Sequence, residues 1–126
     1  MIKSMLETEA KLRIQENIRS KNFKLIWSYI LDYENSKTPF SLRRTQIAKW
    51  RSYAVKDIEK DDELLKQANL IVSSQIKKQD SMHIACAIKG NADYFLTTDD
   101  GILNKSDFIN NIKIIDPIGF IKEVSV

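Results

Sequence analysis

Apolar residues recur at near-helical spacing over the first twenty positions of the chain. This stripe consists of Ile2, Leu6, Ala10, Ile14 and Ile18. Charged and polar residues fill most of the positions between them, so the pattern predicts an amphipathic helix over residues 3–20. The short apolar run 24–28 predicts a buried strand, and Ser28 is placed to cap a second helix that continues through Asn35.

Helices and short strands alternate through the rest of the chain. Pro39 indicates the start of a helix that runs to about Arg51, and residues 52–57 carry a weaker strand pattern. The later expected elements are a helix over 64–72, a helix capped by Asp80 and closed by a left-handed residue at Gly90, and strands over 94–98 and 112–115, each followed by a turn or helix start. This alternation predicts an α/β fold with a parallel sheet flanked by helices.

Size and composition narrow the class of protein. With 126 residues, 43% of them hydrophobic, the chain is long enough for one core, and we expect a single domain over residues 1–126. No apolar stretch reaches the roughly 18 residues that a membrane span needs. The first residues are too charged for a signal peptide, and a single cysteine, Cys86, cannot form an intramolecular disulfide. We therefore expect a cytoplasmic protein outside the membrane. Its net charge of +3 permits contact with a polyanion without requiring it.

Three carboxylates stand where the predicted fold would bring them together. Glu34 continues an apolar helical stripe that starts at Trp27, Asp80 opens a helix that precedes a strand, and Asp99 ends that strand. In a parallel α/β sheet, helix N-termini collect at the carboxyl edge of the strands, where such sheets bind ligands. Each acid also has a simpler interpretation: Glu34 as a solvated helix end, Asp80 as a helix cap, and Asp99 as a turn or cap residue.

A cluster of these acids would suit a hard cation. Carboxylates brought together repel one another, and Mg²⁺ or Mn²⁺ with oxygen ligands is the common compensation. Such ions activate water and neutralise charge on a phosphate, which fits phosphodiester hydrolysis. Thr97 lies at the same edge and would hydrogen-bond a ligand carboxylate or a metal-bound water; the alternative is that it simply favours the strand.

Two stretches of the sequence resemble PIN domains. The more specific one is residues 79–88 (QDSMHIACAI) with 92–99 (ADYFLTTD), and the other is residues 27–35 (WSYILDYEN), within a likeness that extends from about Leu6 to Phe120. PIN domains are Mg²⁺- or Mn²⁺-dependent nucleases, many of them ribonuclease toxins of type II toxin–antitoxin pairs. The resemblance implies a metal-dependent endoribonuclease whose catalytic, metal-binding acids are Glu34, Asp80 and Asp99, with RNA as substrate and an antitoxin protein as partner.

The sequence differs from the PIN family at its N-terminus. PIN domains begin with a central strand that ends in the first metal-binding Asp, whereas this sequence starts in the following helix, and neither Glu7 nor Glu9 matches that position. We therefore expect the family's first strand and its Asp to be absent from this chain, which would leave unpaired backbone groups and favour association, for example as a homodimer. The alternative function is a catalytically inactive PIN remnant that binds protein or RNA.

Basic residues concentrate between positions 37 and 60, which carry seven of them against two acids. Arg43, Arg44 and Lys49 are the candidates for contact with an RNA backbone, and a solvated helix face is the alternative. His83, one helical turn from Asp80, is interpreted as a structural residue rather than a general base.

Overall fold

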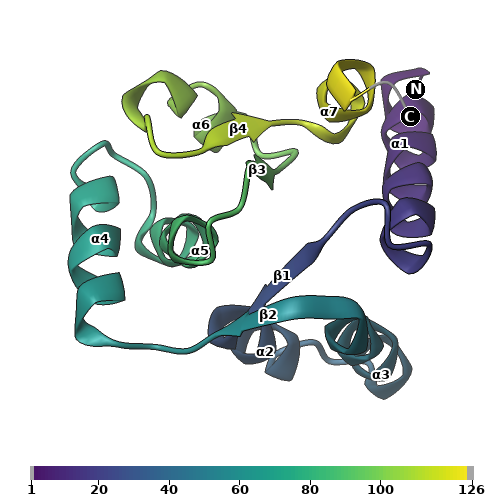
Figure 1. Ribbon diagram of the computed structural model, residues 1–126, viewed down its shortest axis with the longest axis horizontal. Helices are drawn as coiled ribbons and strands as arrows, with labels where there is room; N and C mark the ends of the chain where they lie inside the picture. The colour runs from purple at the N-terminus through teal and green to yellow at the C-terminus, as the bar shows by residue number, and fades with distance from the viewer. Residues whose placement is uncertain (1, 125–126) are drawn as a thin grey trace. The chain divides into compact units, whose positions relative to one another are not determined.

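The computed structural model describes residues 2–124, and contacts along the chain divide it into two compact units. Unit 1 combines the two ends, residues 1–24 and 93–126, and unit 2 is the middle, residues 25–92. Figure 1 labels the elements in chain order. Each unit holds helices and one pair of parallel strands, which confirms the predicted α/β class and the parallel pairing. Among residues 2–124, no helix has both the length and the apolar character needed to cross a membrane.

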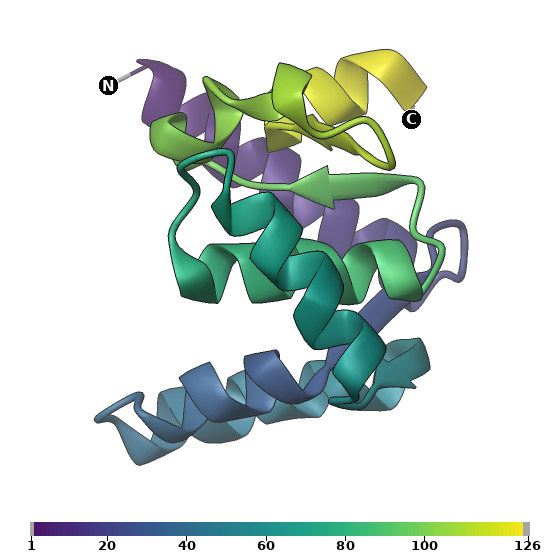
Figure 2. The same cartoon turned by 90° about the vertical axis from the view of Figure 1, so that its left-hand side faces the viewer.

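Unit 2 is built on one strand pair and four α-helices. Its elements are β1 (Leu25–Ser28), α2 (Tyr29–Ser36), α3 (Ser41–Lys49), the 3-10 turn η1 (Trp50–Tyr53), β2 (Ala54–Ile58), α4 (Asp62–Val72) and α5 (Lys78–Lys89). β1 and β2 run parallel, with Ser28 opposite Ile58 at their ends. The helices α4 and α5 lie against each other, and Figure 2 shows this contact. Their buried side chains, among them Leu64 and Ile84, form the main core of the unit.

Local capping explains where α4 begins. Asp61 has an extended backbone, and its Oδ1 accepts a hydrogen bond of 2.8 Å from the Leu64 amide. An aspartate in this position satisfies one of the amide groups that a helix start leaves without a partner. Buried Leu64, Ala68 and Ile71 then follow at helical spacing.

The predicted caps of α5 are wrong at both ends. The helix begins at Lys78 with Lys77 before it, so Asp80 is a first-turn residue rather than the cap. At the other end Gly90 has a φ of −76°, and the left-handed residue is Asn91 at 57°. Gly90 is needed for space instead: a Cβ there would lie 2.9 Å from Cγ2 of Ile26 on β1.

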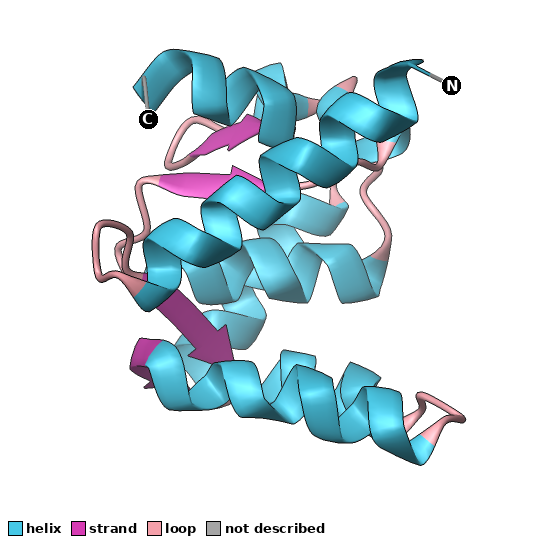
Figure 3. Cartoon of the chain, turned by 90° about the vertical axis from the view of Figure 1, so that its right-hand side faces the viewer, coloured by secondary structure: helices cyan, strands magenta, loops and turns pink. Residues whose placement is uncertain are grey.

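Unit 1 packs the first helix of the chain against the last. Its elements are α1 (Ile2–Arg19), β3 (Tyr94–Leu96), α6 (Asp100–Leu103), the 3-10 turn η2 (Ser106–Phe108), β4 (Lys113–Ile115) and α7 (Pro117–Val124). β3 and β4 run parallel, and Figure 3 shows these two strands side by side behind α1. The centroid of the Phe120 ring lies 5.1 Å from that of Phe23 and 4.9 Å from that of Tyr94, both in edge-to-face geometry. These contacts pack α7 against β3 and against the segment that follows α1.

The strands of unit 1 differ from the prediction in length. Both strands of unit 1 are shorter than expected, and Thr97 lies just beyond β3, although its amide still donates to the Ile115 carbonyl at 3.1 Å. Within residues 2–124, β1 pairs with β2 in unit 2 and β3 pairs with β4 in unit 1. Strand pairing depends on contacts between distant segments, which the spacing of apolar residues does not specify.

Candidate functional site

Glu34 is anchored between two helices of unit 2. It lies one turn after buried Ile30 on α2, and its Oε1 accepts a hydrogen bond of 2.5 Å from Nε2 of Gln79 on α5. The same oxygen lies 2.6 Å from Nε2 of His83, one turn further along α5. The Glu34 side chain is 39% exposed and that of His83 is 14% exposed, so the carboxylate is partly shielded from solvent. Glu34 is therefore more than a solvated helix end.

The surroundings of Glu34 favour its charged form. Partial burial by itself would raise the pKa of this carboxyl, but the hydrogen bonds from His83 and Gln79 and the attraction of the His83 ring together lower it below the ordinary range. A carboxylate that is ionised at neutral pH and fixed through one oxygen is suited to bind a cation. Oε2 makes no hydrogen bond to another residue in the described part of the chain.

Asp80 lies in the turn of α5 that Glu34 reaches. It is the third residue of the helix, half-buried, and sits between Gln79 and His83 in the sequence. Because α2 packs on α5 and Glu34 contacts Gln79, Glu34 lies at the end of α5 that carries Asp80. An acid in a first turn also interacts favourably with the helix dipole, which is a structural reason for its presence.

Asp99 and Thr97 belong to unit 1, where they form the turn that follows β3. Asp99 takes the N-cap position of α6 and its Oδ1 accepts from the Ile102 amide at 3.3 Å, which matches the cap interpretation. The Asp99 amide in turn donates to Oγ1 of Thr97 at 3.1 Å. That Asp99 joins Glu34 and Asp80 in one site stays a prediction.

Glu34 and Asp80 are the two carboxylates of this region that could hold a metal ion. Residues 2–124 contain no group of three or more His, Cys, Asp or Glu side chains that could hold a metal ion. Mg²⁺, however, is commonly bound through one or two carboxylates and completes its shell with water and substrate phosphate. Glu34 and Asp80 are two such carboxylates, and the hydrogen bonds from Gln79 and His83 are of the kind that orient metal-binding side chains.

The predicted RNA-contact residues on α3 have different roles. Arg43 and Lys49 are exposed, whereas Arg44 is half-buried and its Nη1 donates to the Thr38 carbonyl at 2.7 Å. The Arg44 carbonyl also accepts from Nδ2 of Asn35 at 3.0 Å, so Arg44 fastens the loop between α2 and α3. Of the three candidates, Arg43 and Lys49 are the ones presented to solvent.

Sequence reasoning overlooked three contacts of the site region. Gln79 and His83 are four residues apart, so both project from one face of α5, and that spacing was a signal that they act on a common partner. Asp32 accepts a hydrogen bond of 2.9 Å from Nε1 of buried Trp27. Trp27 itself lies on β1 rather than on the helix.

The chain matches no protein-family model, no curated protein and no solved structure.

Proposed function

We propose that this chain is a PIN-like, Mg²⁺-dependent endoribonuclease in which Glu34 and Asp80 bind the metal. The observation that supports this proposal is the Glu34 carboxylate, whose Oε1 is held by two donors from α5 while Oε2 is left without a hydrogen bond to another described residue. A glutamate is ionised at neutral pH, as a hard cation requires, and the surroundings of Glu34 lower its pKa further. Asp99 enters the proposal through the sequence resemblance, as the third acid.

The protein side chains would orient the site and the metal would supply the chemistry. Gln79 and His83 fix the Glu34 carboxylate, so that little movement is needed when a cation binds. When bound, Mg²⁺ or Mn²⁺ would activate a water molecule and neutralise charge on the phosphate. Exposed Arg43 and Lys49 on α3 would contact the RNA backbone. An antitoxin partner follows from the resemblance to toxin-type PIN domains.

Titration of Mn²⁺ by calorimetry tests the metal site. We expect the wild-type chain to bind Mn²⁺, and Asp80→Asn and Glu34→Gln to weaken binding by about tenfold or more, the loss typical when a metal site is disturbed. Asp62→Asn is the matched control, because Asp62 is an exposed acid in the first turn of α4. Asp99→Asn, measured alongside, tests whether the third acid takes part.

Cleavage of a mixed RNA substrate tests the activity. We expect Mg²⁺- or Mn²⁺-dependent cleavage that chelation abolishes and that Asp80→Asn removes, while Asp62→Asn retains it. Mn²⁺ binding without cleavage would refute the nuclease activity. RNA binding with neither metal binding nor cleavage would refute the metal site as well, and would support the alternative of an inactive PIN-like module.

A further inference from the structure

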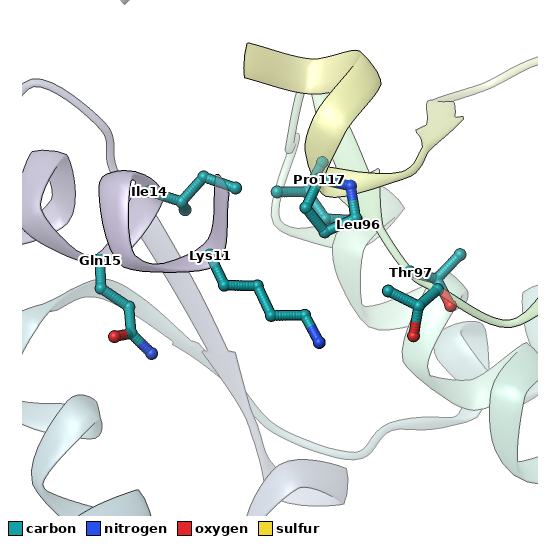
Figure 4. Close-up of a pocket in the computed structure, with 7 residues that line it drawn as sticks. Lys11, Ile14, Gln15, Leu96, Thr97 and Pro117 are labelled. Atoms are coloured by element: carbon teal, nitrogen blue, oxygen red, sulfur yellow. The ribbon is translucent and has the colours of Figure 1, made fainter. Parts of the chain in front are cut away.

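Unit 1 contains a pocket between α1 and the segment that follows β3. Its cavity volume is about 420 Å³, within the range of roughly 300–1,000 Å³ typical of small-molecule sites. The lining residues are Lys11, Ile14 and Gln15 on α1, Leu96, Thr97 and Thr98 at and beyond the end of β3, and Pro117 at the start of α7. Figure 4 shows the Lys11 side chain extending from α1 toward Thr97.

The pocket combines a single positive charge with hydroxyl, amide and apolar groups. Ile14, Leu96 and Pro117 supply aliphatic surface, and Gln15 and the two threonines supply polar groups. Lys11 supplies the charge, and no Asp or Glu is among the described residues that line the pocket. This composition favours a ligand with an anionic group and a larger, partly apolar body.

The cation and the hydroxyl groups are available to a ligand. Lys11 is exposed and forms no ion pair within residues 2–124. Oγ1 of Thr97 accepts a hydrogen bond from the Asp99 amide, which leaves the hydroxyl proton of Thr97 to donate elsewhere. Lysine ammonium and threonine hydroxyl groups are among the donors that contact nucleic-acid phosphates.

We infer that this pocket binds one nucleotide unit of RNA. The phosphate would lie on Lys11 and the threonine hydroxyls, and the sugar and base would lie against Ile14, Leu96 and Pro117. Hydroxyl and amide groups suit the several oxygens of a phosphate and the ribose hydroxyls better than they suit the single carboxylate of an acidic peptide. The choice of RNA rests on the proposed function, but the pocket includes neither Glu34 nor Asp80.

Calorimetric titration with uridine 5′-monophosphate in EDTA tests the inference without depending on the metal site. We expect Lys11→Ala to weaken binding by about tenfold or more, the loss typical of one hydrogen bond to a charged group. Thr98→Val, which removes one hydroxyl, should weaken it by about two- to tenfold. Lys3→Ala is the matched control, because Lys3 is an exposed lysine on the same helix outside the pocket, and it should stay within about twofold of wild type.

Uridine and inorganic phosphate are titrated in parallel to identify the group that is recognised. Uridine should bind much more weakly than the monophosphate, and phosphate alone should also bind more weakly because it lacks the apolar body. The inference is overturned if the monophosphate does not bind, if uridine binds equally well, if phosphate or acetate binds as tightly as the nucleotide, or if both Lys11→Ala and Thr98→Val bind as wild type does. Unchanged nucleotide affinity in Asp80→Asn would show that this pocket and the proposed metal site act independently. A negative result for one proposal would then not count against the other.

Discussion

Replacing Gly90 by alanine should destabilise the folded chain, because α5 ends against the two strands of unit 2. The new methyl group would lie 2.9 Å from Cγ2 of Ile26 on β1 and 3.3 Å from Cδ1 of Ile58 on β2. Non-bonded carbon atoms are most favourable at about 3.5–4.0 Å, so the contact with Ile26 is too short by roughly 0.6 Å or more. The end of α5 or strand β1 must therefore shift.

Two effects of opposite sign set the size of the change. Cγ2 of Ile26 is attached directly to Cβ, where a branched side chain has little rotational freedom, so the overpacking costs about 1–3 kcal/mol. The φ of Gly90 is −76°, which alanine adopts without strain. Alanine also lowers the conformational entropy of the unfolded chain, which stabilises the folded state by about 0.4–1 kcal/mol. The expected net loss is about 0.5–2 kcal/mol of unfolding free energy.

Urea unfolding followed by circular dichroism measures this loss. Gly101→Ala is the control: Gly101 is an exposed glycine of α6 whose nearest neighbour for a new Cβ is Oδ1 of Asp99 at 3.0 Å, on a short and exposed side chain. Oδ1 of Asp99 also accepts from the Ile102 amide as the cap of α6, so displacing it offsets the preference of alanine over glycine in a helix, which is worth up to about 1 kcal/mol. The loss for Gly101→Ala should therefore be smaller than the loss for Gly90→Ala. The double variant Gly90→Ala with Ile26→Leu should recover part of the loss, since leucine has no methyl branch on Cβ. A Gly90→Ala chain as stable as wild type would refute the close approach of α5 to β1.

Two further predictions concern ionisable groups. His83→Ala should raise the pKa of Glu34, because it removes a hydrogen bond and a charge that favour the carboxylate, and a side-chain NMR titration of Glu34 would show no change if the contact is absent. The pKa values of Glu34, Asp61 and Glu123 are lowered in the fold, the last two by hydrogen bonds from Lys89 and Lys113. Their contribution to stability is therefore complete above the ordinary carboxyl pKa of about 4, and it is lost as the pH falls through the pKa values of the folded state. We expect the urea midpoint to fall as the pH is lowered from 6 to 3, and a midpoint that increases as the pH is lowered would contradict this prediction.

Secondary structure was largely predictable because it depends on local spacing. The predicted helix over residues 3–20 corresponds to α1 at Ile2–Arg19, and the predicted strand at 24–28 corresponds to β1 at Leu25–Ser28. The exceptions are at helix ends. Lys78 and Gln79 favour helix strongly enough for α5 to begin before Asp80, so an aspartate that reads as a cap became a first-turn residue.

The sequence indicated that Glu34 faces another part of the chain, but it did not indicate which residues surround it. The position of Glu34 on an apolar stripe indicated that it faces the interior, and it does reach α5. The identity of its partners, Gln79 and His83, depends on how α2 and α5 pack, and these partners lie 45 and 49 residues further along the chain. No local pattern specifies a contact over that separation.

The sequence by itself determined the order of helices and strands, the α/β class and the carboxylates worth testing, because each of these follows from the chemistry of neighbouring residues. Tertiary structure decided which strands pair, that Gly90 is present for close packing rather than for a left-handed turn, and that Gln79 and His83 of α5 hold the Glu34 carboxylate. These features depend on distances between segments remote in sequence, and only packing fixes such distances.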